Sequence, residues 1–400
     1  MQNIPALCSR HHQGEMDDGR TSGNAHPNRY KQAANKNITR THGFLSDPMS
    51  VDSSGYRTGD RPCHSIFSWH FLLTAAARTI SLKQVLRMQE AEAWTVFCAI
   101  RWPETAGAPV CPHCHCPTCW TCPRANGAPR FRCKACRRDF SPTSGTLFAF
   151  HKLEIRDYLA AVVIFCDEVK GKAALALARD LGVQYKTAFV LAHKIREAMA
   201  AEVRGLHLGG AGRHVEIDSC YVGGHVRPAN WKVDRKDRRL AENQSGKRQV
   251  VVVIRERTLA GTSLGGTIPA VFASEDAALG FIKARVDRAS TVHADESPAW
   301  NALHARFDTR RINHSVEYAN DEACTNQAEA YFARLRRGEM GHHHHISGAY
   351  LVRYAREAAW KEDHRRDSNG QQVRRVIVLV TRSGPSVDFC GYWQRSRPAA

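Results

Sequence analysis

The spacing of apolar residues predicts that regular structure begins near Ser81. Apolar positions recur at helical spacing from Leu82 to Ile100, and Ser81 with Gln84 forms the Ser-x-x-Gln pattern of a capping box at the start of a helix. Residues 1–80 lack such periodicity and are rich in Ser, Asn, His, Asp and Gly. We therefore expect residues 1–80 to be disordered, or to be an upstream extension of the reading frame that lies outside the functional protein.

Residues 149–205 show the apolar pattern of three successive helices. They are expected over 153–165, 174–181 and 184–199, with Gly182 in the turn before the third. This turn length fits a helix-turn-helix, whose second helix enters the major groove of DNA. Generic packing of three helices is the alternative. The polar residues expected on or near the exposed side of the recognition helix, and hence as DNA contacts, are Gln184, Lys186, Thr187, Lys194 and Arg196.

Strand and helix patterns alternate between residues 206 and 366. Val215 and Ile217 alternate with polar residues, as in a half-buried strand, and the aliphatic run from Val250 to Ile254 is typical of a central strand. The further elements expected are a strand over 265–271, a helix over 277–286, a strand over 291–294, a helix beginning near Pro298, a strand over 311–316 and a helix carrying Ala328, Phe332 and Leu335. This order is the one expected for a ribonuclease H-like fold, so the predicted class is α/β.

The C-terminal region contains one more clear helical pattern, from Tyr350 to Trp360. Val376 to Thr381 is a short aliphatic run for which we expect a last strand, within a C-terminal tail of residues 367–400. His342 to His345 form a cluster of four histidines that is able to bind a transition metal, or to form a polar segment where a helix ends. The pattern leaves both interpretations open.

Two Cys-x-x-Cys pairs predict a zinc site in residues 81–148. Cys111 and Cys114 form the first pair and Cys133 and Cys136 the second, with eighteen residues between Cys114 and Cys133. Two such turns supply four thiolates to one tetrahedral structural Zn²⁺. The alternative is four free thiols in a core. Fourteen cysteines in a long chain, several of them in such pairs, favour metal binding in a reducing cytoplasm over a disulfide framework.

The charge balance indicates a polyanionic partner. The formal net charge is +18, which favours binding to nucleic acid and makes that binding strongly salt-dependent. No run of about 18 apolar residues is present, so we expect no membrane-spanning helix and a cytoplasmic, DNA-associated protein. The segment 225–248 is especially basic and is a candidate DNA clamp, or a mobile solvated hairpin; its cations include Arg235, Lys236, Arg238 and Arg239.

Three acidic residues lie where separate elements can bring them together. Asp218 leaves its strand on the face opposite the two aliphatic residues, Asp295 lies at the end of a strand, and Glu329 shares a helix face with Arg336. A pair of divalent cations about 4 Å apart, as phosphodiester chemistry requires, needs carboxylates held on rigid elements. Taken singly, each of the three is as readily a solvated, inert acid.

In this order, the motifs resemble the bacterial insertion-sequence transposases of the DDE superfamily, in the ISXO-like group that carries an N-terminal zinc ribbon. The similarity covers residues 81–366, most of the chain. It rests on several ordered segments, among them RWPETAGAPVCPHC, FRCKACRRDFSPTSGTLF, VEIDSCYVGG, HADES and NQAEAYFARLRRGEMGHHHHIS.

The resemblance implies roles for the acidic residues. Asp218 and Asp295 take the places of the first two catalytic acids. Glu329 takes the third place, because Arg336 follows it by seven residues in the acid-then-basic helix typical of the superfamily. Asn326 is the alternative, since some members of the group use an asparagine.

The resemblance also implies the reaction. The zinc ribbon and the helix-turn-helix would hold the terminal inverted repeats of the element, and the catalytic residues would hold two Mg²⁺ or Mn²⁺ ions. Water would free a 3′-hydroxyl, which would then attack target DNA by in-line displacement. Double-stranded DNA is the expected partner, and joining two ends implies a homo-oligomer, with a dimer expected. The alternatives are a non-catalytic regulator made of ribbon and helix-turn-helix, and a ribonuclease H-like nuclease that hydrolyses without joining.

Overall fold

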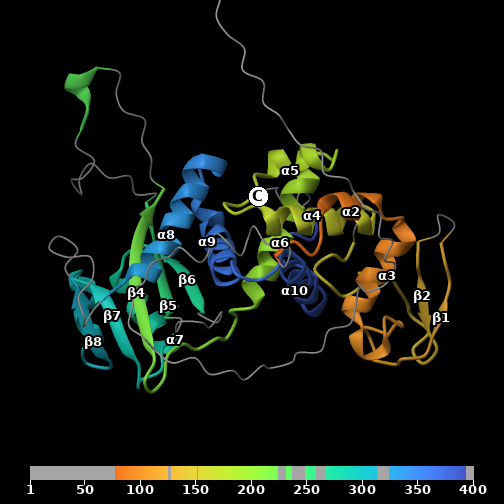
Figure 1. The fold of residues 1–400 in the computed structure, drawn as a ribbon, viewed down its shortest axis with the longest axis horizontal. Coiled ribbons are helices and arrows are strands. Elements are labelled where there is room, and N and C mark those ends of the chain that lie inside the picture. The colour runs from red at the N-terminus through yellow and green to blue at the C-terminus, as the bar shows by residue number, and fades with distance from the viewer. Residues whose placement is uncertain are drawn as a thin grey trace, which may run out of the picture. The chain divides into compact units, whose positions relative to one another are not determined.

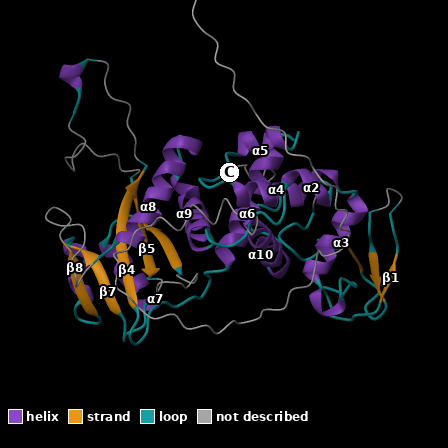
Figure 2. Ribbon diagram, in the orientation of Figure 1, coloured by secondary structure: helices purple, strands orange, loops and turns teal. Residues whose placement is uncertain are grey.

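The structure is a computed structural model with a mixed α/β architecture, so the predicted class is confirmed (Figure 2). It describes residues 77–124, 128–150, 152–223, 231–236, 248–257, 266–312 and 324–392. All of these residues belong to the second of two compact units, Cys63–Ala400. The prediction for the N-terminal extension therefore lies almost wholly outside the described residues.

The first helical region is two helices where one was predicted. They are α2 (Leu82–Arg87) and α3 (Glu90–Arg101), and the chain between them is extended at Met88 and Gln89. The predicted capping box is confirmed, because the side chains of Ser81 and Gln84 each accept a hydrogen bond from the other's backbone N–H.

A three-stranded antiparallel sheet follows, formed by β1 (Cys119–Thr121), β2 (Phe131–Cys133) and β3 (Asp139–Phe140). One face of this ribbon is buried, where Phe131 and Phe140 pack edge-on against Trp102 at the end of α3. The aromatic cluster attaches the ribbon to the preceding helix.

Three helices then form a core with α2 and α3. They are α4 (Ile155–Asp167), α5 (Ala174–Asp180) and α6 (Tyr185–Ala201), and Gly182 adopts a left-handed backbone in the turn before α6. Ten residues of α4 are buried, because neighbouring helices surround it. The carboxylate of Glu90 in α3 accepts the backbone N–H groups of Ile155 and Arg156 and so caps α4 from another element.

The prediction that Lys194 and Arg196 are exposed on the recognition helix is wrong. Lys194 is 8% and Arg196 1% exposed. Arg196 donates to the Glu357 carboxylate at 2.7 Å, and Lys194 donates to the carbonyl oxygen of Ala149. These cations are covered by other parts of the chain and cannot contact a DNA groove.

The predicted strand over 376–381 is also wrong, since this segment lies in helix α10 (Asn369–Arg382). Ser368 and Gln371 form a second capping box, and the buried residues recur every three or four positions: Val373, Val376, Ile377 and Val380. Helix α10 packs on α3, α4 and α6, so part of the predicted C-terminal tail belongs to the helical core.

A five-stranded sheet forms the second core, in the order β6-β5-β4-β7-β8 (Figure 1). Its strands are β4 (His214–Val222), β5 (Gln249–Glu256), β6 (Thr267–Phe272), β7 (Thr291–Asp295) and β8 (Asp308–Ile312). Strands β5 and β6 run antiparallel to their neighbours, whereas β7 runs parallel to β4 and β8 parallel to β7. The strand predicted over 311–316 begins at Asp308, and residues 313–323 lie outside the described part.

Both faces of this sheet are covered. Val215 and Ile217 pack with η5 (Asp276–Ala278), α7 (Leu279–Arg285) and the short 3-10 helix η6 (Pro298–Leu303). Cys220 and Val222 point to the other face, against α8 (Asn326–Gly338) and α9 (Gly348–Asp363). Strand β4 was expected to be half-buried, but even its Glu216 is 0% exposed.

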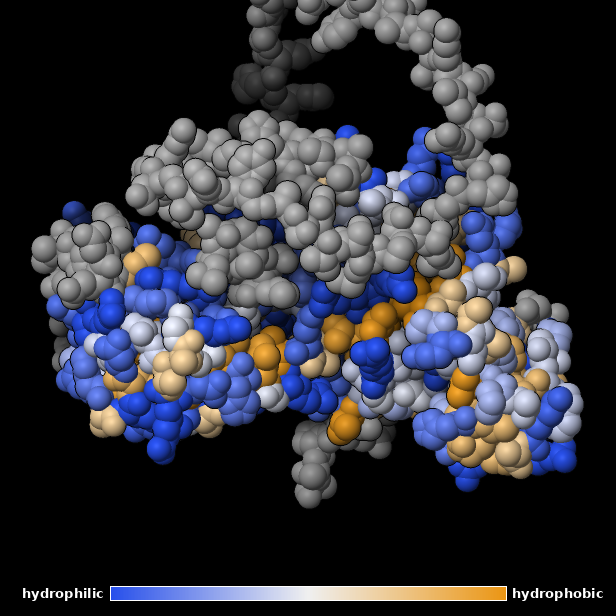
Figure 3. Space-filling model, turned by 60° about the horizontal axis from the view of Figure 1, so that its bottom comes forward, coloured by the Kyte–Doolittle hydropathy of each residue, from blue (hydrophilic) through white to orange (hydrophobic). Residues whose placement is uncertain are grey.

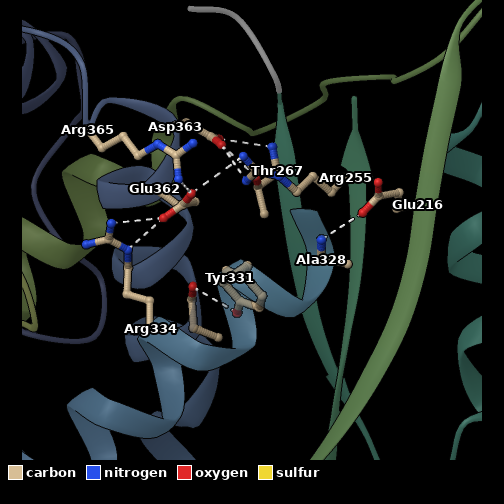
Figure 4. Close-up of polar contacts among 10 residues, drawn as sticks. Glu216, Arg255, Thr267, Ala328, Tyr331, Arg334, Glu362, Asp363 and Arg365 are labelled. Carbon is tan, nitrogen blue, oxygen red and sulfur yellow. Dashed lines mark hydrogen bonds and ion pairs between the residues drawn. The ribbon is translucent and has the colours of Figure 1, made fainter. Parts of the chain in front are cut away.

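Helix α9 contacts both the sheet and helix α6. At its C-terminal end, Asp363 accepts hydrogen bonds from Thr267 of β6 and pairs with Arg255 of β5 at 3.2 Å, while Glu362 binds Arg334 of α8 (Figure 4). Near its middle, Glu357 pairs with Arg196 of α6. Polar contacts along one helix therefore tie the helical core to the sheet.

Hydrophilic side chains cover much of the described surface seen in Figure 3. None of the helices in the described ranges combines the length and apolar character that a membrane crossing requires.

The end of α9 meets the end of α6 through His364. Its ring nitrogens lie 3.0 Å from Glu202 and 2.8 Å from Asp367. Burial lowers the pKa of His364, but the hydrogen bonds to Asp367 and Glu202 outweigh burial and raise the pKa to about 9. The charged imidazolium thus stabilises the folded chain.

We expect His364→Gln to lower the free energy of unfolding by about 2 kcal/mol near pH ~6, and by far less near pH ~10. The folded pKa is above the unfolded value, so the stabilisation is complete below the unfolded pKa and is lost as pH rises through about 9. Urea unfolding followed by circular dichroism at both pH values measures this. An equal loss at the two pH values would mean that His364 acts by packing alone.

Candidate active site and zinc site

Strand register brings Asp218 and Asp295 together. Strands β4 and β7 are parallel neighbours in which Ile217 pairs with Ala294, so Asp218 and Asp295 are the next residues of each strand. Side chains at paired positions point to the same face of a sheet, and here that face is the one covered by α8. Both aspartates are half-buried, Asp218 in the middle of β4 and Asp295 at the last residue of β7.

Helix α8 is fixed against β4 by the buried carboxylate of Glu216. This carboxylate accepts the backbone N–H of Ala328 in the first turn of α8 at 2.8 Å (Figure 4). It also accepts the Nε–H of Arg257 at 2.8 Å. Thr325, at the N-cap of α8, makes no capping hydrogen bond with its own side chain. Glu216 therefore caps the helix from the sheet and sets the position of Glu329, the residue after Ala328.

The electrostatics of the site indicate that the three acids are close. Burial is the main reason that the pKa of Asp218 is raised to about 7, and the charges of Asp295 and Glu329 raise it further. Burial and the nearby charge of Glu275 raise the pKa of Asp295. Repulsion among buried carboxylates disfavours the metal-free charged state, and bound cations would relieve it.

The two other predicted residues of α8 are both exposed. Asn326 is at the first position of the helix, one turn before Glu329. Arg336 is near the helix end, and its Nε donates to the sulfur of Cys220, two residues after Asp218, at 3.1 Å. A guanidinium group is thereby held at the edge of the acidic site.

Glu275 is a residue of this site that the sequence pattern does not indicate. Its carboxylate accepts the hydroxyl of Ser219 at 2.5 Å and the hydroxyl of Ser297 at 2.6 Å. Ser219 follows Asp218 directly, and Ser297 also donates its backbone N–H to Asp295. Glu275 thus links the parts of β4 and β7 that carry the aspartates. A Ser one residue after Asp218 and another two residues after Asp295 were visible in the sequence, but nothing local indicated their shared acceptor.

On the strand-transfer activity that the resemblance predicts, we expect Glu275→Gln to cause a loss of about tenfold or more. The uncharged amide has one acceptor oxygen and one NH2 group in place of two acceptor oxygens, so the two hydrogen bonds from Ser219 and Ser297 cannot both be kept as they are and the spacing of Asp218 and Asp295 is loosened. A gel assay of end joining over a Mg²⁺ titration measures the effect. The neighbouring exposed acid Asp276→Asn is the matched control, and equal activity in both variants would rule out a role for Glu275.

The four predicted zinc ligands do converge. The sulfurs of Cys111, Cys114, Cys133 and Cys136 all lie within 4.8 Å of one another. Two sulfur pairs are 3.6 and 3.5 Å apart, close to the roughly 3.8 Å edge of a tetrahedron with Zn–S bonds of about 2.3 Å. Although burial opposes it, N–H groups of His113 and Cys114 lower the pKa of Cys111, whereas, against the lowering effect of the Cys116 N–H, the sulfur of Cys133 raises the pKa of Cys114, so the clustered thiols share their protons. The four cysteines fit a structural Zn²⁺.

Within the described ranges, no other set of three His, Cys, Asp or Glu ligand atoms lies this close together. Asp218, Asp295 and Glu329 do not form such a group in this structure. His342 and His343 fall in a π-helical turn, η7 (Glu339–His343), where His343 packs on the ring of Tyr354. The metal-binding interpretation of the histidine cluster gains no support from this geometry.

The predicted DNA contacts divide into three groups. Gln184 and Lys186 are exposed and Thr187 is half-buried, all at the start of α6. Arg235 and Lys236 are exposed in the basic segment after β4. Arg238 and Arg239 lie outside the described residues. Lys194 and Arg196 are excluded as DNA contacts because they are buried.

Comparison with known proteins supports the resemblance. Residues 207–363 match the family described as the ISXO2-like transposase domain. This part of the chain is therefore similar to that domain, and the resemblance to insertion-sequence transposases is confirmed.

A particular relative extends the similarity beyond this domain. An uncharacterized protein in transposable element ISH50 of Halobacterium salinarum (strain ATCC 700922 / JCM 11081 / NRC-1) is 24% identical over 297 residues. The match covers 72% of this chain and 96% of that protein. No solved structure matches the chain.

Proposed function

We propose that this protein is a DNA transposase that binds the terminal inverted repeats of an insertion sequence, cleaves DNA strands and transfers them in a Mg²⁺-dependent reaction. The observation that carries the proposal is the convergence of Asp218 and Asp295 on neighbouring parallel strands, with Glu329 near enough to raise the pKa of Asp218. Solvated, inert acids would not be half-buried beside one another. The family match supports the same conclusion.

The sheet supports a ribonuclease H-like catalytic domain over residues 206–366. Its first strand along the chain, β4, lies at the centre, with β5 and β6 on one side and β7 and β8 on the other. Strand β5 runs antiparallel to β4, and β6 runs antiparallel to β5, so β6 has the same direction as β4. Asp218 in the middle of β4 and Asp295 at the end of β7 therefore lie on the face of the sheet that α8 covers.

The residues of the acidic site have different proposed roles. Two Mg²⁺ or Mn²⁺ ions, when bound, would activate the water or 3′-hydroxyl nucleophile and stabilise the leaving oxygen. Asp218, Asp295 and Glu329 would hold these cations, and Glu329 is preferred over Asn326 because it is half-buried and acts on the charge of Asp218. Arg336 would bind a phosphate beside them.

The two proposed N-terminal domains would bind the DNA. The zinc ribbon within 81–148 and the helix-turn-helix-like region 149–205 would hold the inverted repeats, with Gln184, Lys186 and Thr187 toward the groove. The net charge of +18 supports a polyanionic ligand. Two ends must be held together during transfer, so we propose that the protein acts in the cytoplasm on DNA as a homo-oligomer.

The test supplies a precut donor end and a plasmid target with Mg²⁺. Joined product is expected, and it would depend on the divalent cation. Nicked plasmid without joining would instead identify a nuclease, and a shifted gel band without either product would identify a DNA-binding regulator.

A further inference from the structure

The zinc ribbon has one face turned away from its aromatic core. The antiparallel register places Trp120 opposite Arg132, and Arg132 opposite Asp139, so these three side chains share a face. This face is exposed, whereas the alternate residues Phe131 and Phe140 are buried.

Positive charge on this face is only partly neutralised. Arg132 makes two hydrogen bonds with Asp139, at 2.6 and 3.1 Å, so this pair is electrically balanced. Three further cations are exposed on the second cysteine turn, and no carboxylate in the described part of the chain forms an ion pair with them: Lys134, Arg137 and Arg138. A surplus of positive charge therefore faces solvent.

Two of these cations are held by an aromatic ring. The guanidinium carbon of Arg137 lies 4.8 Å and the Nζ of Lys134 5.7 Å from the ring centre of Trp120. Stacking on the ring restricts both side chains before any ligand arrives, so less conformational entropy is lost on binding. We call Trp120, Lys134 and Arg137 the ribbon face.

The backbone of Arg137 has a conformation that suits glycine. Its φ is +60°, and its N–H donates to the carbonyl of Cys133 at 3.1 Å. The first cysteine turn has the same geometry at His115, with φ of +57° and an N–H bond to Cys111 at 3.0 Å. Because a left-handed backbone is strained for a residue with a Cβ, local stability favours glycine at both positions. Compared with a glycine at this position, Arg137 provides a guanidinium group stacked on Trp120.

We propose that the ribbon face binds phosphate groups of duplex DNA. The proposal rests on the function proposed above, because it assigns part of the DNA contact to the ribbon. A guanidinium group and an ammonium group on one aromatic platform present charge-assisted donors suited to phosphate oxygens. These contacts carry no base specificity, so they strengthen binding to any duplex.

The test is Arg137→Gly in the full chain, with His115→Gly as the matched control on the other cysteine turn. A labelled duplex DNA of arbitrary sequence serves as the probe, measured by fluorescence anisotropy over a salt series. We expect Arg137→Gly to weaken binding about fivefold to tenfold and to reduce the slope of log Kd against log salt by about 0.9. Zinc retention, followed with a chelating dye, should be equal to or greater than that of the parental protein. His115→Gly should keep the parental affinity.

The outcomes are separable. Parental affinity in an Arg137→Gly protein that keeps its zinc would overturn the proposal, as would an equal loss in His115→Gly. If the glycine variant loses zinc, Arg137→Gln, which keeps a side chain without charge, decides the phosphate contact by the same salt series. Absence of DNA binding by the parental protein would overturn the proposed function itself, whereas end joining with an unchanged salt slope in both Arg137 variants would overturn only the role of the ribbon face.

Discussion

Asp218→Asn is expected to reduce strand transfer by roughly a thousandfold or more, equivalent to about 4 kcal/mol of transition-state stabilisation. The amide has nearly the same shape as the carboxylate but lacks the charge that holds a divalent cation. Binding to inverted-repeat DNA should stay at the parental level, because the DNA-binding regions are left intact. A joining assay and a gel-shift assay on the same preparations measure both quantities.

The same variant is expected to be more stable than the parental protein when Mg²⁺ is absent. Burial and two neighbouring carboxylates raise the pKa of Asp218 to about 7, above its unfolded value, so its charge costs stability as pH rises through this range. Glu296→Gln, beside Asp295 but exposed, is the matched control and should change neither property. Joining at the parental rate by Asp218→Asn would refute the catalytic assignment.

Arg196→Ala is expected to lower the free energy of unfolding by about 3–5 kcal/mol. The loss follows from Glu357, which is 3% exposed and would keep a buried charge without its cation. One oxygen of Glu357 and one nitrogen of Arg196 already make no hydrogen bond, so no other donor is in place to replace Arg196 on the carboxylate. Chemical denaturation monitored by tryptophan fluorescence measures the change.

Replacing both members, Arg196→Met with Glu357→Leu, should recover part of this stability, because no buried carboxylate is then left without Arg196, although the buried Lys361 loses the nearby charge of Glu357. A double variant as unstable as the single one would contradict the ion-pair explanation. Lys186→Ala, at an exposed position on the same helix, should instead weaken DNA binding and leave the unfolding transition nearly unchanged. A stable Arg196→Ala protein with impaired DNA binding would restore Arg196 as a DNA contact.

The sequence predicts those features that depend on local spacing. Alternating residues predict strand β4 with Asp218 on one face, and cysteine spacing predicts the four converging sulfurs. Local spacing does not predict that β4 pairs with β7 and so brings Asp295 beside Asp218; that prediction also needs the order of the strands in the sheet. Glu275 and Glu216 could not be found in this way, because their partners lie 22 to 112 residues away along the chain.

Two errors have different physical origins. In α10, a short aliphatic run was taken as a strand although Ser368 and Gln371 supply a helix start eight residues before Val376. The helical spacing of buried residues over the whole segment would have corrected it. On α6, Lys194 and Arg196 have the composition of a DNA-binding surface, but α9 and the segment before α4 cover them, which local sequence does not reveal.

Glutamates from other elements close the starts of two helices, Glu90 at α4 and Glu216 at α8. Neither helix has a capping hydrogen bond from the side chain of its own N-cap residue, so each first turn takes its acceptor from a residue synthesised long before it, 65 residues earlier for Ile155 and 112 for Ala328. On the ribosome, the contact between Glu216 and Ala328 that positions Glu329 can form only after the strands between them have been synthesised. Under the proposed function, a growing chain would acquire its activity only after this domain is complete.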